Sequence, residues 1–194
     1  MPDNDLSRRT VLAASALWPM LGAASACARP GGNAIGPGSK LLVAYFTRSG
    51  NTQVIAGTIH RALKTDLFQI RPARPYPADY EENVQQAAEE TARGYEPPLE
   101  ARVTNLAAYD AVFLGHPVWG MTLPPVIRSF LRAHDFRGKT IRPFITHGGY
   151  GLGNCVELLN HHAPGARIEK SFVMEADQEK RTLGEVRGWL GGIG

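Results

Sequence analysis

The chain has 194 residues, of which 43% are hydrophobic and 20% charged, with two cysteines and a formal net charge of +3. This length fits one domain, or one domain with an extension, and the apolar content excludes wholesale disorder. Two cysteines cannot build a disulfide-stapled scaffold, and so small an excess of positive charge is weak support for nucleic-acid binding. We therefore expect no nucleic acid among the partners.

The first 28 residues have the composition of an export signal. Arg8 and Arg9 precede an uncharged run, Thr10 to Ala28, that is rich in Ala, Ser and Leu. Such a signal consists of a charged N-terminal region, a mildly apolar middle and a cleavage site made of small residues. The paired arginines resemble the twin-arginine class, which serves proteins exported already folded. We therefore expect an exported, periplasmic protein with its signal at residues 1–28.

Two alternatives for the N-terminal segment stay open. It is long enough to be a marginal membrane anchor, and Cys27 is the residue that a lipoprotein signal would modify, so either route would tether the protein to a membrane. Residues 29–38 are rich in Gly and Pro and predict a flexible linker. The folded domain is then residues 39–194, and we expect no integral membrane span in the mature protein.

The folded domain begins with a strand, a polar loop and a helix. Residues 41–46 are six consecutive apolar residues, as in a strand that is buried on both faces of a parallel sheet. Further along, Val54, Ile55, Ile59 and Leu63 fall on one face of a helix. The polar segment that joins strand and helix consists of Thr47, Arg48, Ser49, Gly50, Asn51 and Thr52.

This arrangement predicts an anion site at the start of the helix. Free backbone N–H groups, the positive end of the helix dipole and the hydroxyls of Thr47, Ser49 and Thr52 converge there, and Gly50 lets the backbone curl around a phosphate. The simpler interpretation is that Ser49 and Thr52 only cap the helix. A single capping residue would explain one hydroxyl side chain, but it does not explain four polar residues with a glycine among them. No Gly-Lys-Ser/Thr follows, which excludes a nucleoside-triphosphate loop.

The rest of the chain alternates strands and helices. The acids of the helix at 80–93, among them Glu90, are expected on a solvated face. Together with the first strand, this alternation predicts a doubly wound α/β fold with a five-stranded parallel sheet. Further strands are expected at 66–70, 111–115, 141–146 and within 166–174, and helices at 80–93, 125–133, 154–161 and 183–190.

Two further loops are candidate sites, because ligands of doubly wound sheets bind at the carboxyl ends of the strands. In the loop after the third strand a Trp offers a planar face for stacking, and in the loop after the fourth, glycines admit backbone amides close to a ligand. The candidate residues are Pro117, Val118, Trp119 and Gly120 in the first of these loops, and Thr146, His147, Gly148, Gly149 and Tyr150 in the second.

Several reactive side chains have a structural interpretation instead. Cys155 is expected to be a small packing residue at the start of a helix. His161 and His162 are expected to be a pair at a helix end, because no third metal ligand has a usable spacing. Trp119 is either a partner of a ligand ring or an anchor packed under its own loop. We therefore expect no metal site and assign no catalytic residue.

The loop at 47–52 resembles the FMN-phosphate loop of flavodoxins, which holds the phosphate with hydroxyls and amides and without a lysine. Residues 75–80, 117–119 and 146–149 are similar to a bacterial subfamily of small, single-domain flavodoxins, and the similarity spans about 40–190. A second tryptophan is usual after Trp119 in that subfamily, but this chain has Gly120 there. The resemblance implies a three-layer flavodoxin-like fold, FMN as cofactor, and the candidate residues of all three loops as its contacts.

The resemblance favours an electron-transfer protein that acts with a redox partner protein or a small-molecule electron acceptor. Two alternatives stay open: an FMN-dependent NAD(P)H:quinone or other small-molecule reductase, and a partner-binding domain without flavin. Residues 1–27 carry two acids and two arginines, so the whole charge of +3 belongs to the remainder of the chain. Flavodoxins that dock on basic reductases are typically acidic, so this charge points to acidic or membrane-associated partners.

Overall fold

The computed structural model describes residues 38–175 and 179–193. The predicted export signal at 1–28, and all of the predicted linker except Gly38, lie outside these residues, so both interpretations stay predictions. None of the helices in the described part of the chain is both long and apolar enough to cross a membrane.

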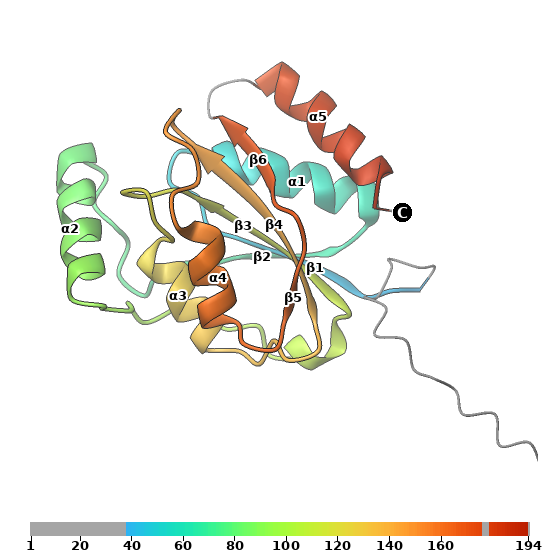
Figure 1. Cartoon of the computed structure of the whole chain (residues 1–194), viewed down its shortest axis with the longest axis horizontal. Helices are drawn as coiled ribbons and strands as arrows, with labels where there is room; N and C mark the ends of the chain where they lie inside the picture. The colour runs from blue at the N-terminus through green and yellow to red at the C-terminus, as the bar shows by residue number, and fades with distance from the viewer. Residues whose placement is uncertain (1–37, 176–178, 194) are drawn as a thin grey trace, which may run out of the picture. The chain divides into compact units, whose positions relative to one another are not determined.

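A parallel sheet forms the centre of the domain (Figure 1). Its strands are β1 (Leu41–Tyr45), β2 (Asp66–Gln69), β3 (Ala111–Pro117), β4 (Thr140–His147), β5 (Arg167–Ile168) and β6 (Phe172–Glu175). The strand order is β2-β1-β3-β4, with β5 and β6 both paired to β4, and every pairing is parallel. The predicted doubly wound fold is confirmed, and all carboxyl ends of the strands face one edge.

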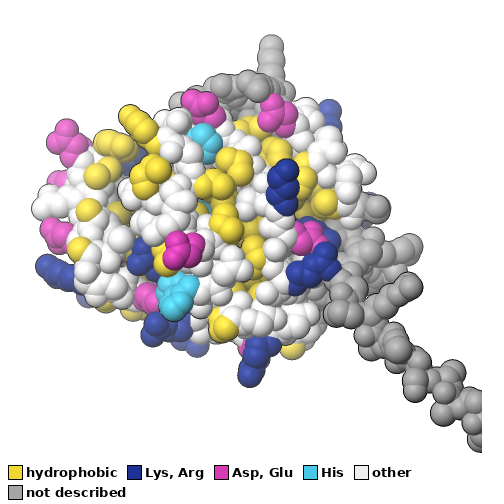
Figure 2. Space-filling view, in the orientation of Figure 1, with side chains coloured by type: hydrophobic (Ala, Val, Ile, Leu, Met, Phe, Trp, Pro, Cys, Tyr) yellow, Lys and Arg dark blue, Asp and Glu magenta, His cyan; other side chains and the backbone are white. Residues whose placement is uncertain are grey.

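The expected fifth strand is divided into two short segments. β5 pairs with the start of β4, and β6 pairs with its end. Between the segments, the carboxylate of Glu169 lies 2.6 Å from the guanidinium of Arg142, whose side chain is buried. The interruption therefore coincides with the residue that neutralises a buried charge. Figure 2 shows hydrophobic side chains at the surface near β5 and β6, and Val173 of β6 is 37% exposed, as expected at an open sheet edge.

Helices cover both faces of the sheet and give the three expected layers (Figure 1). α1 (Asn51–Leu63) and α5 (Glu179–Gly191) pack on one face, and α3 (Pro125–Arg132) and α4 (Cys155–His162) pack on the other. α2 (Tyr80–Ala92) lies to the side of α3, and a short 3-10 turn, Leu106–Ala108, precedes β3. Each predicted helix is present, although α5 begins four residues before its expected start at 183.

The sheet is buried on both faces because alternate residues of its central strands enter two separate hydrophobic cores. Leu42 and Leu114 belong to the core under α3 and α4, whereas Val43 and Phe113 belong to the core under α1 and α5. These continuous apolar runs are why the strands were recognisable from the sequence. They also fix the register that brings the ends of β1, β3 and β4 together.

The expectation of a fully solvated acidic face on α2 is wrong for Glu90, which is only 8% exposed. One carboxylate oxygen of Glu90 accepts a hydrogen bond from the Tyr76 hydroxyl at 2.8 Å, and the other accepts one from Gln86 at 2.9 Å. Asn83, Ala87 and Glu90 are the buried residues of α2. Their spacing of four and three residues places them on one face, so Glu90 lies on the packed side of the helix.

We expect acid to destabilise the domain through His116 of β3. Burial of this fully enclosed side chain lowers its pKa from 6.5 to about 4. The unfolded chain takes up a proton near pH 6.5 but the folded chain does not until about pH 4. Stability is therefore lost as the pH falls through this range, by about 3 kcal/mol from this residue. Denaturant titrations of His116→Gln between pH 7 and 4 are expected to show a correspondingly smaller decline.

The matched control for His116 is His161→Gln, because His161 is exposed. This variant removes a histidine but leaves His116 in place, so its pH profile is expected to lie closer to that of the unaltered protein than the profile of His116→Gln does. Burial also lowers the pKa values of His134 and His162, so part of the decline remains in both variants. A profile of His116→Gln that overlays the unaltered one would show that His116 does not resist protonation in the folded protein.

Candidate functional site

Three loops meet at the carboxyl edge of the sheet: loop A (residues 46–50), loop B (118–124) and loop C (148–154). A buried hydrogen bond of 2.9 Å between the hydroxyls of Thr52 and Thr146 joins the start of α1, after loop A, to the end of β4, before loop C. The backbone N–H of Val118 donates to the carbonyl of Thr146 at 2.8 Å, and that of Asn154 donates to the carbonyl of Met121 at 3.1 Å. The structure thus brings the three predicted segments together.

Loop A leaves the start of α1 open. Gly50 precedes the helix in a left-handed conformation (φ +94°), and its N–H donates to the Thr47 hydroxyl oxygen at 3.0 Å. No side chain caps α1, and Thr52 directs its hydroxyl to Thr146 instead. The interpretation of Ser49 and Thr52 as helix caps is therefore wrong. Backbone amides in the first turn, the exposed Ser49 and the helix dipole remain for an anion.

Arg48 belongs to loop A, but its guanidinium is engaged elsewhere. It donates to the carbonyl of Ala78 at 2.8 Å and lies over the ring of Tyr80, with 5.4 Å between the guanidinium carbon and the ring centroid. Arg48 thus ties loop A to the start of α2. An anion at loop A would be held mainly by amides and hydroxyls, which are the donors that loop A leaves available.

Loop B is a tight hairpin turn. The backbone N–H of Trp119 donates to the carbonyl of Thr122 at 3.2 Å, and the reverse bond is 3.0 Å. The two residues between them, Gly120 and Met121, have positive φ angles of 55° and 61°. Such a turn suits Gly120, but Met121 adopts a conformation that a side chain with a Cβ disfavours. The turn therefore needs support from its surroundings.

Trp119 is held by aromatic neighbours. Its ring makes edge-on contacts with Phe46 (centroids 5.1 Å apart) and Tyr76 (4.8 Å), and the side chain is half-buried. Trp119 therefore anchors loop B in the protein, and its contact with a ligand ring stays a prediction. Tyr76 was not predicted as a site residue, although it contacts Trp119. The signal was an aromatic residue between two prolines in a loop.

Loop C follows Thr146 and His147 at the end of β4. Thr146 is buried, and His147 accepts a hydrogen bond through Nδ1 from the N–H of Gly149 at 3.1 Å. Gly148 and Gly149 are exposed, and Gly149 has a φ of 103°. Tyr150 is 85% exposed, so it extends from the domain rather than packing on it. Loop C thus presents its backbone to the carboxyl edge, as the glycines predicted.

Gly153 was missed as a site residue, although it fixes loop C against loop B. Its φ is +53°, and a Cβ at this position would lie 1.8 Å from the carbonyl oxygen of Met121. Only glycine allows the backbone of loop C to approach Met121 so closely. This contact also supports the disfavoured conformation of Met121. The sequence signal was the high glycine content of residues 148–153, which does not reveal that the contact is with Met121.

Cys155 lies at the start of α4, directly after loop C, whereas His161 and His162 lie at the other end of that helix. Cys155 is fully buried, and burial raises the pKa of its thiol to about 12, which keeps it protonated and unreactive at neutral pH. His161 and His162 are the last residues of α4. In the described residues, no group of three or more His, Cys, Asp or Glu side chains is placed to hold a metal ion.

The sequence profile of the flavodoxin family matches residues 40–191. Among solved structures, a protein of Bacteroides eggerthii classed as a flavoprotein is 32% identical (TM-score 0.68), over 80% of this chain and 98% of that one. A similarly classed protein of Bacteroides uniformis is 29% identical (TM-score 0.69), over 79% and 99% of the chains. A flavoprotein of Lactobacillus acidophilus, solved in complex with FMN, shares the fold at 22% identity (TM-score 0.60), over 75% and 99%. Among curated proteins, no match was found.

We expect Gly153→Ala to destabilise the domain by about 2–4 kcal/mol, because the new Cβ collides with the Met121 carbonyl and the φ is positive. Gly148→Ala is the matched control, since no heavy atom lies within 4 Å of a Cβ there and its φ is not positive. Denaturant unfolding of the two variants tests the contact. Equal stability of both variants would contradict the close approach of loops B and C.

Proposed function

Because the chain belongs to the flavodoxin family, we propose that it binds FMN noncovalently at loops A, B and C and transfers electrons. The observation that carries this proposal is the uncapped start of α1 beside Gly50, at the carboxyl edge where loops B and C also meet. Crevices at this edge are where doubly wound sheets bind their ligands. The residues of the three loops fit FMN, which combines a dianionic phosphate with a planar ring.

Loop A is proposed to hold the phosphate. The hydroxyls of Thr47 and Ser49, and the amides from Ser49 to the first turn of α1, would surround it, with Gly50 and Asn51 shaping the backbone. Thr52 contributes its backbone amide and holds the start of α1 in place through its hydrogen bond to Thr146. Charge-assisted hydrogen bonds of about 1.5–3 kcal/mol each make such donors effective without a lysine. Arg48 contributes by fixing loop A to Ala78.

Loops B and C are proposed to flank the ring. Bound FMN would supply the reversible uptake of electrons, and the protein would position the ring and set its electrostatic surroundings. Trp119 offers the planar side chain, Pro117, Val118 and Gly120 shape its loop, and Thr146, His147, Gly148, Gly149 and Tyr150 form the opposite wall. The two edge-on contacts of Trp119 fix the orientation in which its ring would meet the flavin.

The electron-transfer partner is proposed to be an acidic or membrane-associated redox protein, or a small-molecule acceptor. The charge of +3 outside residues 1–27 supports such partners by electrostatic attraction. We further propose that the protein is exported by the twin-arginine route, as Arg8, Arg9 and the uncharged run after them suggest. That route moves folded proteins, so FMN would be inserted before export.

We expect FMN to bind at least tenfold more tightly than riboflavin, because riboflavin lacks the phosphate that loop A addresses. Gly50→Ala is expected to reduce this difference, since Gly50 has a φ of +94° and a Cβ there distorts the loop. The control is Gly138→Ala, which also has a positive φ (71°) and open space around a Cβ but lies far along the chain from loop A. It should leave the difference in affinity between FMN and riboflavin unchanged. Calorimetric titration measures both ligands. Equal affinities in the unaltered protein would reject the phosphate site.

The same preparation tests the redox function. A flavin absorption spectrum of the purified protein is expected, and it would remove the alternative of a domain without flavin. Anaerobic titration with NADH and NADPH then distinguishes the two redox alternatives. Bleaching by either nucleotide alone would indicate a reductase, whereas an electron-transfer protein requires a separate redox partner to be reduced.

We expect replacement of both Arg8 and Arg9 by Lys to retain the protein in the cytoplasm, because the twin-arginine pathway reads the paired arginines. Cell fractionation followed by immunoblotting measures the distribution. Replacement of Arg29, which lies beyond the uncharged run, by Lys is the control and should leave export unchanged. Undiminished export of the double variant would favour another route.

A further inference from the structure

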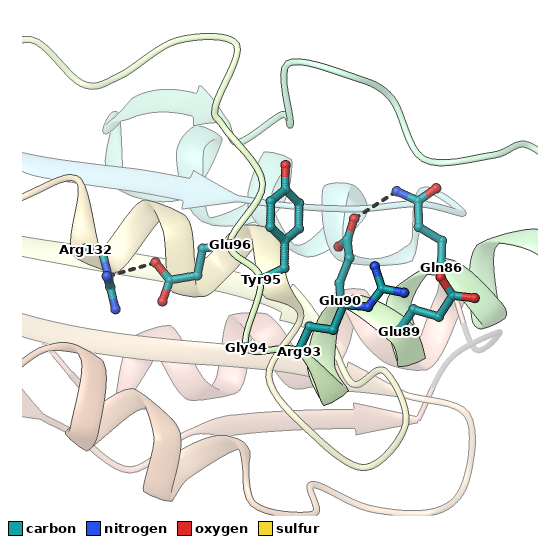
Figure 3. A pocket seen from close by; sticks show the side chains of 8 residues that line it. All are labelled: Gln86, Glu89, Glu90, Arg93, Gly94, Tyr95, Glu96 and Arg132. Atoms are coloured by element: carbon teal, nitrogen blue, oxygen red, sulfur yellow. Dashed lines mark hydrogen bonds and ion pairs between the residues drawn. The ribbon is translucent and has the colours of Figure 1, made fainter.

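A cavity lies on the domain away from the loops described above, and none of its lining residues belongs to loops A, B or C. It has a volume of about 730 Å³, which is in the range of small-molecule sites. It opens between the end of α2, the turn that follows it and the last turn of α3 (Figure 3). The lining residues are Gln86, Glu89, Glu90, Arg93, Gly94, Tyr95, Glu96 and Arg132.

One of the three carboxylates in this cavity forms an ion pair with a basic side chain. Glu96 pairs with Arg132 at 2.8 Å and lies 3.9 Å from His162. Arg93 follows Glu89 by four residues and Glu90 by three at the end of α2, and opposite charges attract one another at both spacings, although Arg93 is within ion-pair distance of neither carboxylate. These neighbours balance most of the charge of the lining.

Glu90 is the most buried of the three carboxylates. It is only 8% exposed, and its oxygens accept hydrogen bonds from the neutral donors Tyr76 and Gln86. In the described part of the chain, no Lys, Arg or His forms an ion pair with it. A buried carboxylate without a counter-ion is costly, so a cation that enters the cavity would gain an interaction that exposed carboxylates do not offer.

The wall beside Glu90 is aromatic. Gly94, with a φ of +61°, turns the chain back at the end of α2, and the N–H of Tyr95 donates to the carbonyl of Glu90 at 2.8 Å. Figure 3 shows the Tyr95 ring between the carboxylates of Glu90 and Glu96. The side chain is 49% exposed, so its face is available to a planar cation.

We propose that this cavity binds a small organic cation with a planar amidinium, guanidinium or aromatic ammonium group. The cationic group pairs with Glu90, and the planar body lies against Tyr95. A metal ion is not the ligand, because no cluster of three or more His, Cys, Asp or Glu side chains in the described residues is placed to hold one. The proposal does not depend on FMN binding.

Calorimetric titration of the full-length protein with benzamidine and with benzamide tests the site. Benzamidine is a planar cation at neutral pH, and benzamide is its neutral isostere. We expect benzamidine to bind at least tenfold more tightly than benzamide. Equal binding of the two, or binding of neither, would overturn the proposal.

Variants then locate the interaction. Glu90→Gln keeps an acceptor for Tyr76 and is expected to weaken benzamidine binding at least tenfold, while Glu81→Gln, at an exposed position in the first turn of α2, removes the same charge and should have no effect. Tyr95→Ala, at a half-exposed side chain, is a second variant that retains the fold if Glu90→Gln does not, and it should also weaken binding. Equal affinities of Glu90→Gln and Glu81→Gln, or an unchanged affinity of Tyr95→Ala, would show that benzamidine binds elsewhere.

Discussion

The parallel alignment of β1, β3 and β4 is the constraint on which the proposed site depends. Because these strands point in one direction, the three loops that follow them emerge at the same edge. The buried hydrogen bond between Thr52 and Thr146 and the backbone bond from Val118 to Thr146 then join the segments around these loops. A strand in the opposite direction would send its loop to the other edge. The site is thus a consequence of topology, and side chains refine it.

Aromatic packing connects this edge to the cavity beside α2. Trp119 contacts Tyr76, and the hydroxyl of Tyr76 donates to Glu90, which lines the cavity beside α2. Burial and the bond to Glu90 raise the pKa of Tyr76, so its hydroxyl stays a donor throughout the physiological range. The carboxylate of Glu90 therefore both accepts the hydrogen bond from Tyr76 and lines the cavity. A cation held by Glu90 changes the acceptor that positions Tyr76, and Tyr76 in turn supports loop B.

The sequence predicted the elements well because their signals are local. The buried strands are continuous apolar runs, and the positions of Gly50, Thr47 and Thr52 after such a run indicated the open helix start. Two features could not be predicted because they depend on residues distant in the chain. Gly153 is required by a backbone atom of Met121, and Glu90 is buried because Tyr76, 14 residues earlier, supplies its donor. The hydrogen bond from Arg48 to the carbonyl of Ala78 likewise could not be predicted, because it depends on the packing of loop A against the segment before α2.

The chemistry of loop A also bears on how the domain uses its positive charge. In the proposed site, amides and hydroxyls at the start of α1 would bind the phosphate through partial charges that the backbone fixes, while the guanidinium of Arg48 is engaged by Ala78 and Tyr80. No cationic side chain is then needed to neutralise a phosphate at this edge. The net positive charge, to which exposed side chains such as Arg61 and Lys64 contribute, acts at long range on approaching molecules. With the proposed site, cofactor binding and partner attraction could be altered separately, since the first would reside in the backbone of one loop and the second in exposed side chains.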